Sequence, residues 1–112
     1  MTATGGDAPK IRVLIVDDHA VVRRGLSELL TTAGDMVVVG ALEDGAGAAK
    51  AVIELEPDLV LMDLSMPGMD GIAATREIIA VRPEALVVVL TSFSDSARIL
   101  GALEAGAVGY LL

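Results

Sequence analysis

Cysteine is absent from the 112-residue sequence, which excludes a disulfide framework, a thiolate metal site and a cysteine nucleophile. Aromatic side chains are limited to Phe93 and Tyr110, so the core must be built from aliphatic residues. No apolar run approaches the ~18 residues that span a bilayer, although 54% of the residues are hydrophobic. Because the first ten residues also lack the basic start and apolar stretch of a secretory signal, we expect a cytoplasmic chain.

Basic side chains are scarce. The sequence has eight lysines and arginines but 16 aspartates and glutamates, so its formal net charge is −8. Nucleic acid backbones and acidic membrane surfaces are bound by clustered lysine and arginine. We therefore expect this chain to bind neither nucleic acid nor a membrane by itself. Its length is that of one domain, large enough to bury a core without disulfides.

Short apolar runs alternate with amphipathic stretches along most of the chain. Residues 1–9 are small and polar and predict a flexible leader, and residues 10–112 predict one domain. Strands are expected at residues 11–16, 36–40, 59–62, 86–90 and 108–112, and helices at residues 20–33, 45–54, 70–81 and 95–105. This alternation predicts βαβ units, and hence a doubly wound α/β fold with a five-stranded parallel sheet buried on both faces.

Acidic and hydroxyl side chains follow three of the predicted strands. Asp17 and Asp18 come after the first strand, Asp63 after the third and Thr91 after the fourth. Ligands of doubly wound folds bind outside the carboxyl ends of the strands, where the strand order reverses. In the flavodoxin-like order 2-1-3-4-5 the first and third strands are neighbours, so we expect the three carboxylates to converge.

A cluster of three carboxylates requires a proton or a cation to offset the like charges. Carboxylates, a backbone carbonyl and water are ligands that suit Mg²⁺. A nucleophilic carboxylate, a metal ion and a hydroxyl donor together indicate phosphoryl transfer. Each residue alone has an ordinary explanation, such as a helix cap for Asp17 and Asp18, so the hypothesis depends on the combination.

Four segments of the chain form one recognisable pattern: IVDDH (15–19), VLMDLSMPGMDG (60–71), VLTSFSD (89–95) and GALEAGAVGYLL (101–112). They resemble the receiver domain of bacterial two-component response regulators, in its NarL/LuxR-type group. The resemblance covers about residues 10–112 and implies a CheY-like fold that takes a phosphoryl group from a sensor histidine kinase. In the full-length protein it implies control of transcription through a helix-turn-helix DNA-binding domain that is absent here.

The same resemblance implies a role for each residue of the cluster. Asp63 corresponds to the phosphoacceptor. Asp17 and Asp18 correspond to the acidic pair that holds Mg²⁺ together with Asp63, and the backbone carbonyl of Ser65 completes the metal site. Thr91 corresponds to the hydroxyl that moves to the acyl phosphate. The resemblance makes the chain a phosphoacceptor that hydrolyses its own acyl phosphate, and not an enzyme acting on other substrates.

At the carboxyl terminus the resemblance concerns Tyr110 and the residues expected after Leu112. Tyr110 corresponds to the aromatic switch residue that turns inward when the hydroxyl moves. The family pattern also continues beyond Leu112, with a lysine directly after it and a fifth helix on one sheet face. We therefore expect a sheet lacking the fifth helix, with an exposed apolar face through which the chain self-associates.

Three other functions remain open at this point. An Asp-nucleophile phosphatase of the haloacid dehalogenase type requires a second acid two residues after the nucleophile, where this chain has Ser65. A flavodoxin-like cofactor binder requires Gly, Ser and Thr after the first strand, where this chain has two aspartates. A phosphorylation-independent interaction module is the third alternative. His19 is interpreted as a solvated residue at the first turn of the first helix, because a lone His makes a poor transition-metal site. Arg98 is interpreted as part of a solvated helix face.

Overall fold

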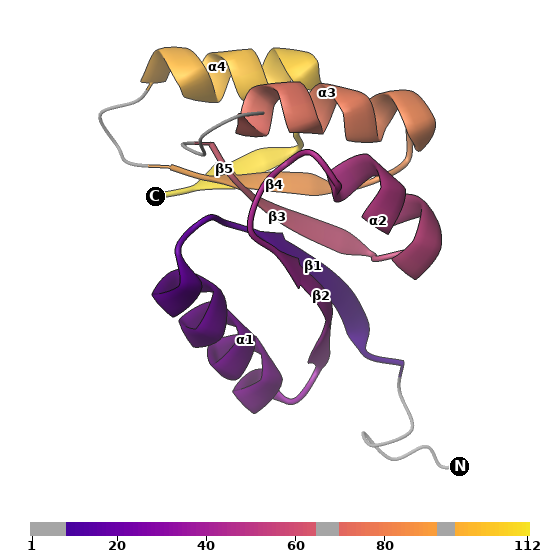
Figure 1. Cartoon of the computed structure of the whole chain (residues 1–112), viewed down its shortest axis with the longest axis vertical. Helices are drawn as coiled ribbons and strands as arrows, with labels where there is room; N and C mark the ends of the chain where they lie inside the picture. The colour runs from indigo at the N-terminus through magenta and orange to yellow at the C-terminus, as the bar shows by residue number, and fades with distance from the viewer. Residues whose placement is uncertain (1–8, 65–69, 92–95) are drawn as a thin grey trace.

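The computed structural model describes residues 9–64, 70–91 and 96–112, and it contains a single five-stranded parallel sheet (Figure 1). The strand order is β2-β1-β3-β4-β5, which confirms the predicted doubly wound order. The strands are β1 (Ile11–Val16), β2 (Met36–Leu42), β3 (Leu59–Asp63), β4 (Val87–Leu90) and β5 (Gly109–Leu111).

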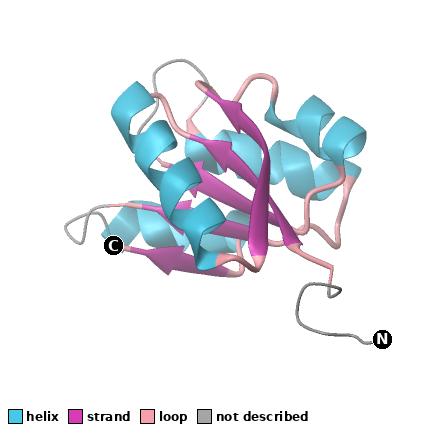
Figure 2. Ribbon diagram, turned by 90° about the horizontal axis from the view of Figure 1, so that it is seen from below, coloured by secondary structure: helices cyan, strands magenta, loops and turns pink. Residues whose placement is uncertain are grey.

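Helices cover both faces of this sheet, as right-handed crossovers between parallel strands require. The helices of the described residues are α1 (Ala20–Ala33), α2 (Ala48–Leu55), α3 (Gly71–Val81) and α4 (Ser96–Ala105). Helix α1 packs on one face, whereas α2, α3 and α4 pack on the opposite face (Figures 1 and 2). None of the helices in the described ranges is long and apolar enough to cross a membrane.

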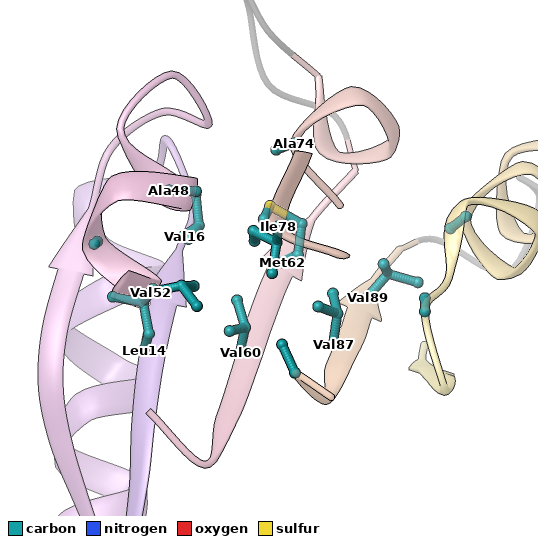
Figure 3. Close-up of a cluster of buried hydrophobic side chains, with 14 of the residues drawn as sticks. Leu14, Val16, Ala48, Val52, Val60, Met62, Ala74, Ile78, Val87 and Val89 are labelled. Carbon is teal, nitrogen blue, oxygen red and sulfur yellow. The ribbon is translucent and has the colours of Figure 1, made fainter. Parts of the chain in front are cut away.

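The main core lies between the sheet and helices α2, α3 and α4 (Figure 3). Alternate strand residues such as Val16, Met62 and Val89 point into it and meet Val52 and Ile78 from the helices. All five side chains are fully buried. Because successive strand residues face opposite sides, the remaining strand residues form a second cluster under α1.

The second cluster is smaller and less enclosed. Val13, Ile15 and Leu61 are buried in it, and Leu26 and Leu30 of α1 pack against them while remaining partly exposed. No residue of α1 is fully buried. Strand β1 is therefore buried on both faces from Val13 to Val16, which explains why these four residues are all apolar.

The element boundaries differ from the predictions mainly around β2 and α2. Strand β2 continues two residues further, to Leu42, where its backbone carbonyl accepts a hydrogen bond from the Asp17 amide. Helix α2 begins at Ala48 and not at Gly45, because the carboxylate of Asp44 accepts a hydrogen bond from the Ala46 amide and closes a turn first. The expected leader falls almost wholly outside the described residues.

Candidate metal and phosphoryl-transfer site

Three carboxylates converge at the carboxyl ends of β1 and β3, as the strand order predicts. The two strands are paired, with Val16 opposite Met62, so Asp17 and Asp63 follow neighbouring positions of the sheet. Asp17, Asp18, His19 and Asp63 each contribute one ligand atom to a group whose atoms all lie within 4.8 Å of one another. Asp17 is 4% exposed and Asp63 is 9% exposed, so the acidic cluster is held at the edge of the core.

The turn between β1 and α1 holds Asp17 through both its backbone and its side chain. The Asp17 amide donates to Leu42 at 3.0 Å, which extends the β1–β2 pairing by one residue. Its Oδ1 accepts a hydrogen bond from the His19 amide at 2.8 Å, and its carbonyl accepts one from Arg23 at 2.7 Å. The carboxylate therefore has a fixed direction, as a preorganised ligand requires.

His19 is exposed at the start of α1, as expected, but its imidazole also contacts the acidic cluster, which was not predicted. His19 is the N-cap of α1, and its Nδ1 lies 3.1 Å from Asp17 Oδ1 and 2.9 Å from Asp18 Oδ1. The hydrogen bond to Asp17, followed by the charge of Asp18, raises the pKa of the imidazole. Its position next to the two aspartates was the sequence signal for this contact.

Asp18 shows most directly that the cluster is suited to a cation. Its Oδ1 is buried and accepts no hydrogen bond from the part of the chain that the structure describes, although His19 lies beside it as an ion-pair partner. A buried carboxylate oxygen without a donor is costly unless a positive charge faces it. The donor set of three carboxylates therefore fits a divalent ion.

The start of α3 is packed directly against the backbone of Asp63. Asp70 caps this helix, as its position before the helix predicts, since its Oδ1 accepts a hydrogen bond from the Ala73 amide at 2.9 Å. A Cβ atom on Gly71 would lie 2.3 Å from the Asp63 carbonyl oxygen. The Gly71 amide faces the Leu64 carbonyl at 3.4 Å, so the absence of a side chain lets α3 approach the end of β3.

Arg98 connects α4 to the same end of β3 and is not the solvated helix residue that we expected. Its guanidinium donates a hydrogen bond to the carbonyl of Leu64, the residue after Asp63. It also lies 3.8 Å from the carboxylate of Asp70. The spacing within the α4 sequence contains no signal for this contact, because it joins segments 34 residues apart.

The remaining predicted residues lie on the neighbouring strands. Thr91 follows β4 and is half-buried, and its amide donates to Leu111 of β5 at 3.0 Å. Since Asp63 is paired with Leu90, Thr91 comes one residue beyond that pair. Tyr110 lies in β5 opposite Val89 and is 47% exposed. Ser65 lies outside the described residues.

Residues 13–112 match the family described as the response regulator receiver domain. This chain belongs to that family. The receiver domain is 46% identical over 102 residues to the transcriptional regulatory protein LiaR of Bacillus subtilis, covering 91% of this chain and 48% of LiaR. It is also 46% identical over 102 residues to the response regulator protein VraR of Staphylococcus aureus, covering 91% of this chain and 49% of VraR. The chain thus spans about half the length of the curated relatives it matches.

Solved receiver domains have the same fold. The signal receiver domain of the response regulator NarL from Mycobacterium tuberculosis superposes with a TM-score of 0.87 at 34% identity, covering 94% of this chain and 85% of that one. A LuxR-family two-component response regulator from Aurantimonas superposes with a TM-score of 0.85 at 40% identity, covering 90% and 72%. This receiver domain is therefore of the LuxR/NarL type. Receiver domains generally depend on Mg²⁺ and are phosphorylated by sensor histidine kinases.

Proposed function

We propose that Asp63 accepts a phosphoryl group from a phosphohistidine of a sensor histidine kinase. The observation that carries the proposal is the convergence of Asp17, Asp18 and Asp63 at one end of the sheet. Asp63 is the member of this group on the central strand β3. We assign Mg²⁺ to Asp17, Asp18, Asp63 and the backbone carbonyl of Ser65, and its role is to screen the negative charge of the carboxylate and the phosphoryl group.

The transfer of the phosphoryl group to Asp63 requires no reactant other than the phosphohistidine. A carboxylate oxygen of Asp63 attacks phosphorus, the phosphorus–nitrogen bond of the phosphohistidine breaks, and the bonding pair returns to the imidazole of the kinase. Asp17 and Asp18 would hold an ion whose positive charge would lower the repulsion between the nucleophile and the incoming group. Water hydrolyses the acyl phosphate later, so the chain regains its starting state without acting on other substrates.

Thr91 and Tyr110 are assigned to the response that follows phosphorylation. The Thr91 hydroxyl is proposed to donate a hydrogen bond to the acyl phosphate, and Tyr110 to turn inward as it moves. Thr91 directly follows β4, and its amide donates a hydrogen bond to Leu111 of β5, so a shift at Thr91 acts directly on β5. In a protein of the length of its curated relatives, we propose that the output is transcription control through a helix-turn-helix domain, in the cytoplasm.

Phosphorylation by acetyl phosphate tests the assignment of Asp63. Intact mass spectrometry of the chain is expected to show one added phosphoryl group that requires Mg²⁺. Asp63→Asn removes the nucleophilic oxygen and is expected to abolish the addition. Asp35→Asn is the matched control, because Asp35 is exposed before β2 at the other end of the sheet. Equal labelling of the Asp63 and Asp35 variants would overturn the assignment.

The alternative functions predict different results, in this experiment and in three other assays. A phosphatase would release phosphate from added esters repeatedly and would not accumulate a phosphoprotein. A phosphorylation-independent interaction module would acquire no mass, and its partner binding would be unaffected by Mg²⁺. A flavodoxin-like protein would bind flavin in a titration, which the two aspartates after β1 oppose because of their negative charge.

We also propose that this 112-residue chain self-associates through the sheet face on the α1 side. Val88 and Leu90 of β4 are only partly buried there, and Leu111 is paired with Leu90 and is 54% exposed. Exposed apolar faces of this kind bind partners. Sedimentation velocity is expected to show dimers or larger species that Leu111→Asp disperses. Ile53→Asp, at an exposed residue of α2, is expected to leave them intact.

A further inference from the structure

Arg98 binds a backbone carbonyl directly beyond the end of the strand that carries Asp63. Strand β3 ends at Asp63, so the Leu64 carbonyl lies outside it. The Gly71 amide is 3.4 Å from this oxygen, which is long for a hydrogen bond, whereas the Arg98 guanidinium donates to it from a shorter distance. A charged donor also forms the stronger hydrogen bond. Among the described residues, Arg98 is therefore the principal donor that fixes the Leu64 carbonyl.

The Arg98 side chain is anchored at its base and at its tip. Ala102, one turn further along α4 on the same side of the helix, is fully buried in the main core. The guanidinium lies 3.8 Å from the carboxylate of Asp70, which caps α3 by accepting a hydrogen bond from the Ala73 amide. Arg98 thus connects α4 with the end of β3 and with the start of α3, at the residue next to the proposed phosphoacceptor.

We propose that Arg98 is a positioning residue for phosphoryl transfer to Asp63. The inference rests on the proposed function, in which a carboxylate oxygen of Asp63 attacks phosphorus. Such a reaction depends on alignment, and misplacing a reacting group by about 1 Å can lower its rate on the order of 100-fold. The Leu64 side chain is buried and its amide donates to Leu90, and Arg98 restrains its carbonyl from the α4 side. Because Leu64 directly follows Asp63, these restraints fix the direction of the Asp63 carboxylate.

The rate of labelling by acetyl phosphate tests this role in Arg98→Met, which keeps the helix propensity of the side chain but removes its donors. Intact mass spectrometry follows the rate at saturating Mg²⁺, so that weaker ion binding does not contribute. The rate is divided by the folded fraction, which urea unfolding measures. Arg98→Met is expected to lower this rate on the order of 10-fold. Arg98→Lys, whose ammonium group still donates to a carbonyl, is expected to recover most of it.

Arg76→Met is the matched control, because it makes the same substitution at an exposed residue of α3, and we expect it to keep the rate of the unaltered chain. A purely structural role for Arg98 would lower the free energy of unfolding and leave the rate per folded molecule unchanged. That result, or an Arg98→Lys variant as slow as Arg98→Met, would overturn the positioning role while Asp63 remains the acceptor. If the unaltered chain gains no phosphoryl group, the proposed function fails and the inference fails with it.

Discussion

Gly71→Ala is expected to destabilise the fold by on the order of 3 kcal/mol or more, because the added methyl group has no space. A Cβ at this position would lie 2.3 Å from the Asp63 carbonyl oxygen and 2.8 Å from the Leu64 Cα. Both are backbone atoms, so no side-chain rotamer change relieves the overlap. The start of α3 must move away from β3, which also displaces the carbonyl of Asp63. Urea unfolding followed by far-UV circular dichroism measures the loss.

The matched control is Gly25→Ala, in the middle of α1. No atom lies within 4 Å of the Cβ position there. Alanine loses less backbone entropy than glycine in a helix, so this variant is expected to gain about 0.5–1 kcal/mol. The two substitutions are chemically identical and should therefore shift the unfolding midpoint in opposite directions. Shifts of the same sign would show that α3 does not approach β3 as closely as the structure indicates.

Ile78→Ala is expected to lower the free energy of unfolding by about 3–4 kcal/mol, since it removes a buried side chain and leaves a cavity. Ile78 is fully buried and belongs to the main core cluster, where α3 faces β3 (Figure 3). A loss of this size is a large fraction of the 5–15 kcal/mol that stabilises a typical domain. The same chemical unfolding experiment measures it.

Ile53→Ala controls for the change in helix propensity, because it makes the same substitution in α2 at a side chain that is 46% exposed. Its loss is expected to be below about 1 kcal/mol, because less apolar surface returns to water and alanine favours the helix. Equal losses at the two isoleucines would contradict the assignment of Ile78 to the core.

The positions of Asp17, Asp18 and Asp63 could be predicted because they depend only on strand order and strand ends. The β-branched runs before Asp17 and Asp63 predict strands, and parallel strands bring their carboxyl ends to one edge of the sheet. The same reasoning placed Thr91 after β4. Asp70 was predictable as a cap because capping is a contact between residues three apart, with the Ala73 amide as the donor.

The start of α2 could not be predicted, because an aspartate side chain competes with the helix for a backbone amide there. The segment from Gly45 to Gly47 is followed by alanines and has no strong preference between helix and turn. The hydrogen bond from the Ala46 amide to Asp44 decides in favour of a turn, so α2 begins at Ala48. Side chains of aspartate compete with the helix for backbone amides in this way, and composition alone does not reveal the outcome.

The sequence by itself determined the alternation of strands and helices, the carboxylates at the strand ends and the apolar faces of the core. These depend on periodicity and on contacts between near neighbours. Only the tertiary structure decided that His19 turns toward the carboxylates and that Arg98 reaches the carbonyl of Leu64. Long charged or polar side chains have many rotamers of similar energy. Their partners are selected by which distant segments the fold brings within hydrogen-bonding distance.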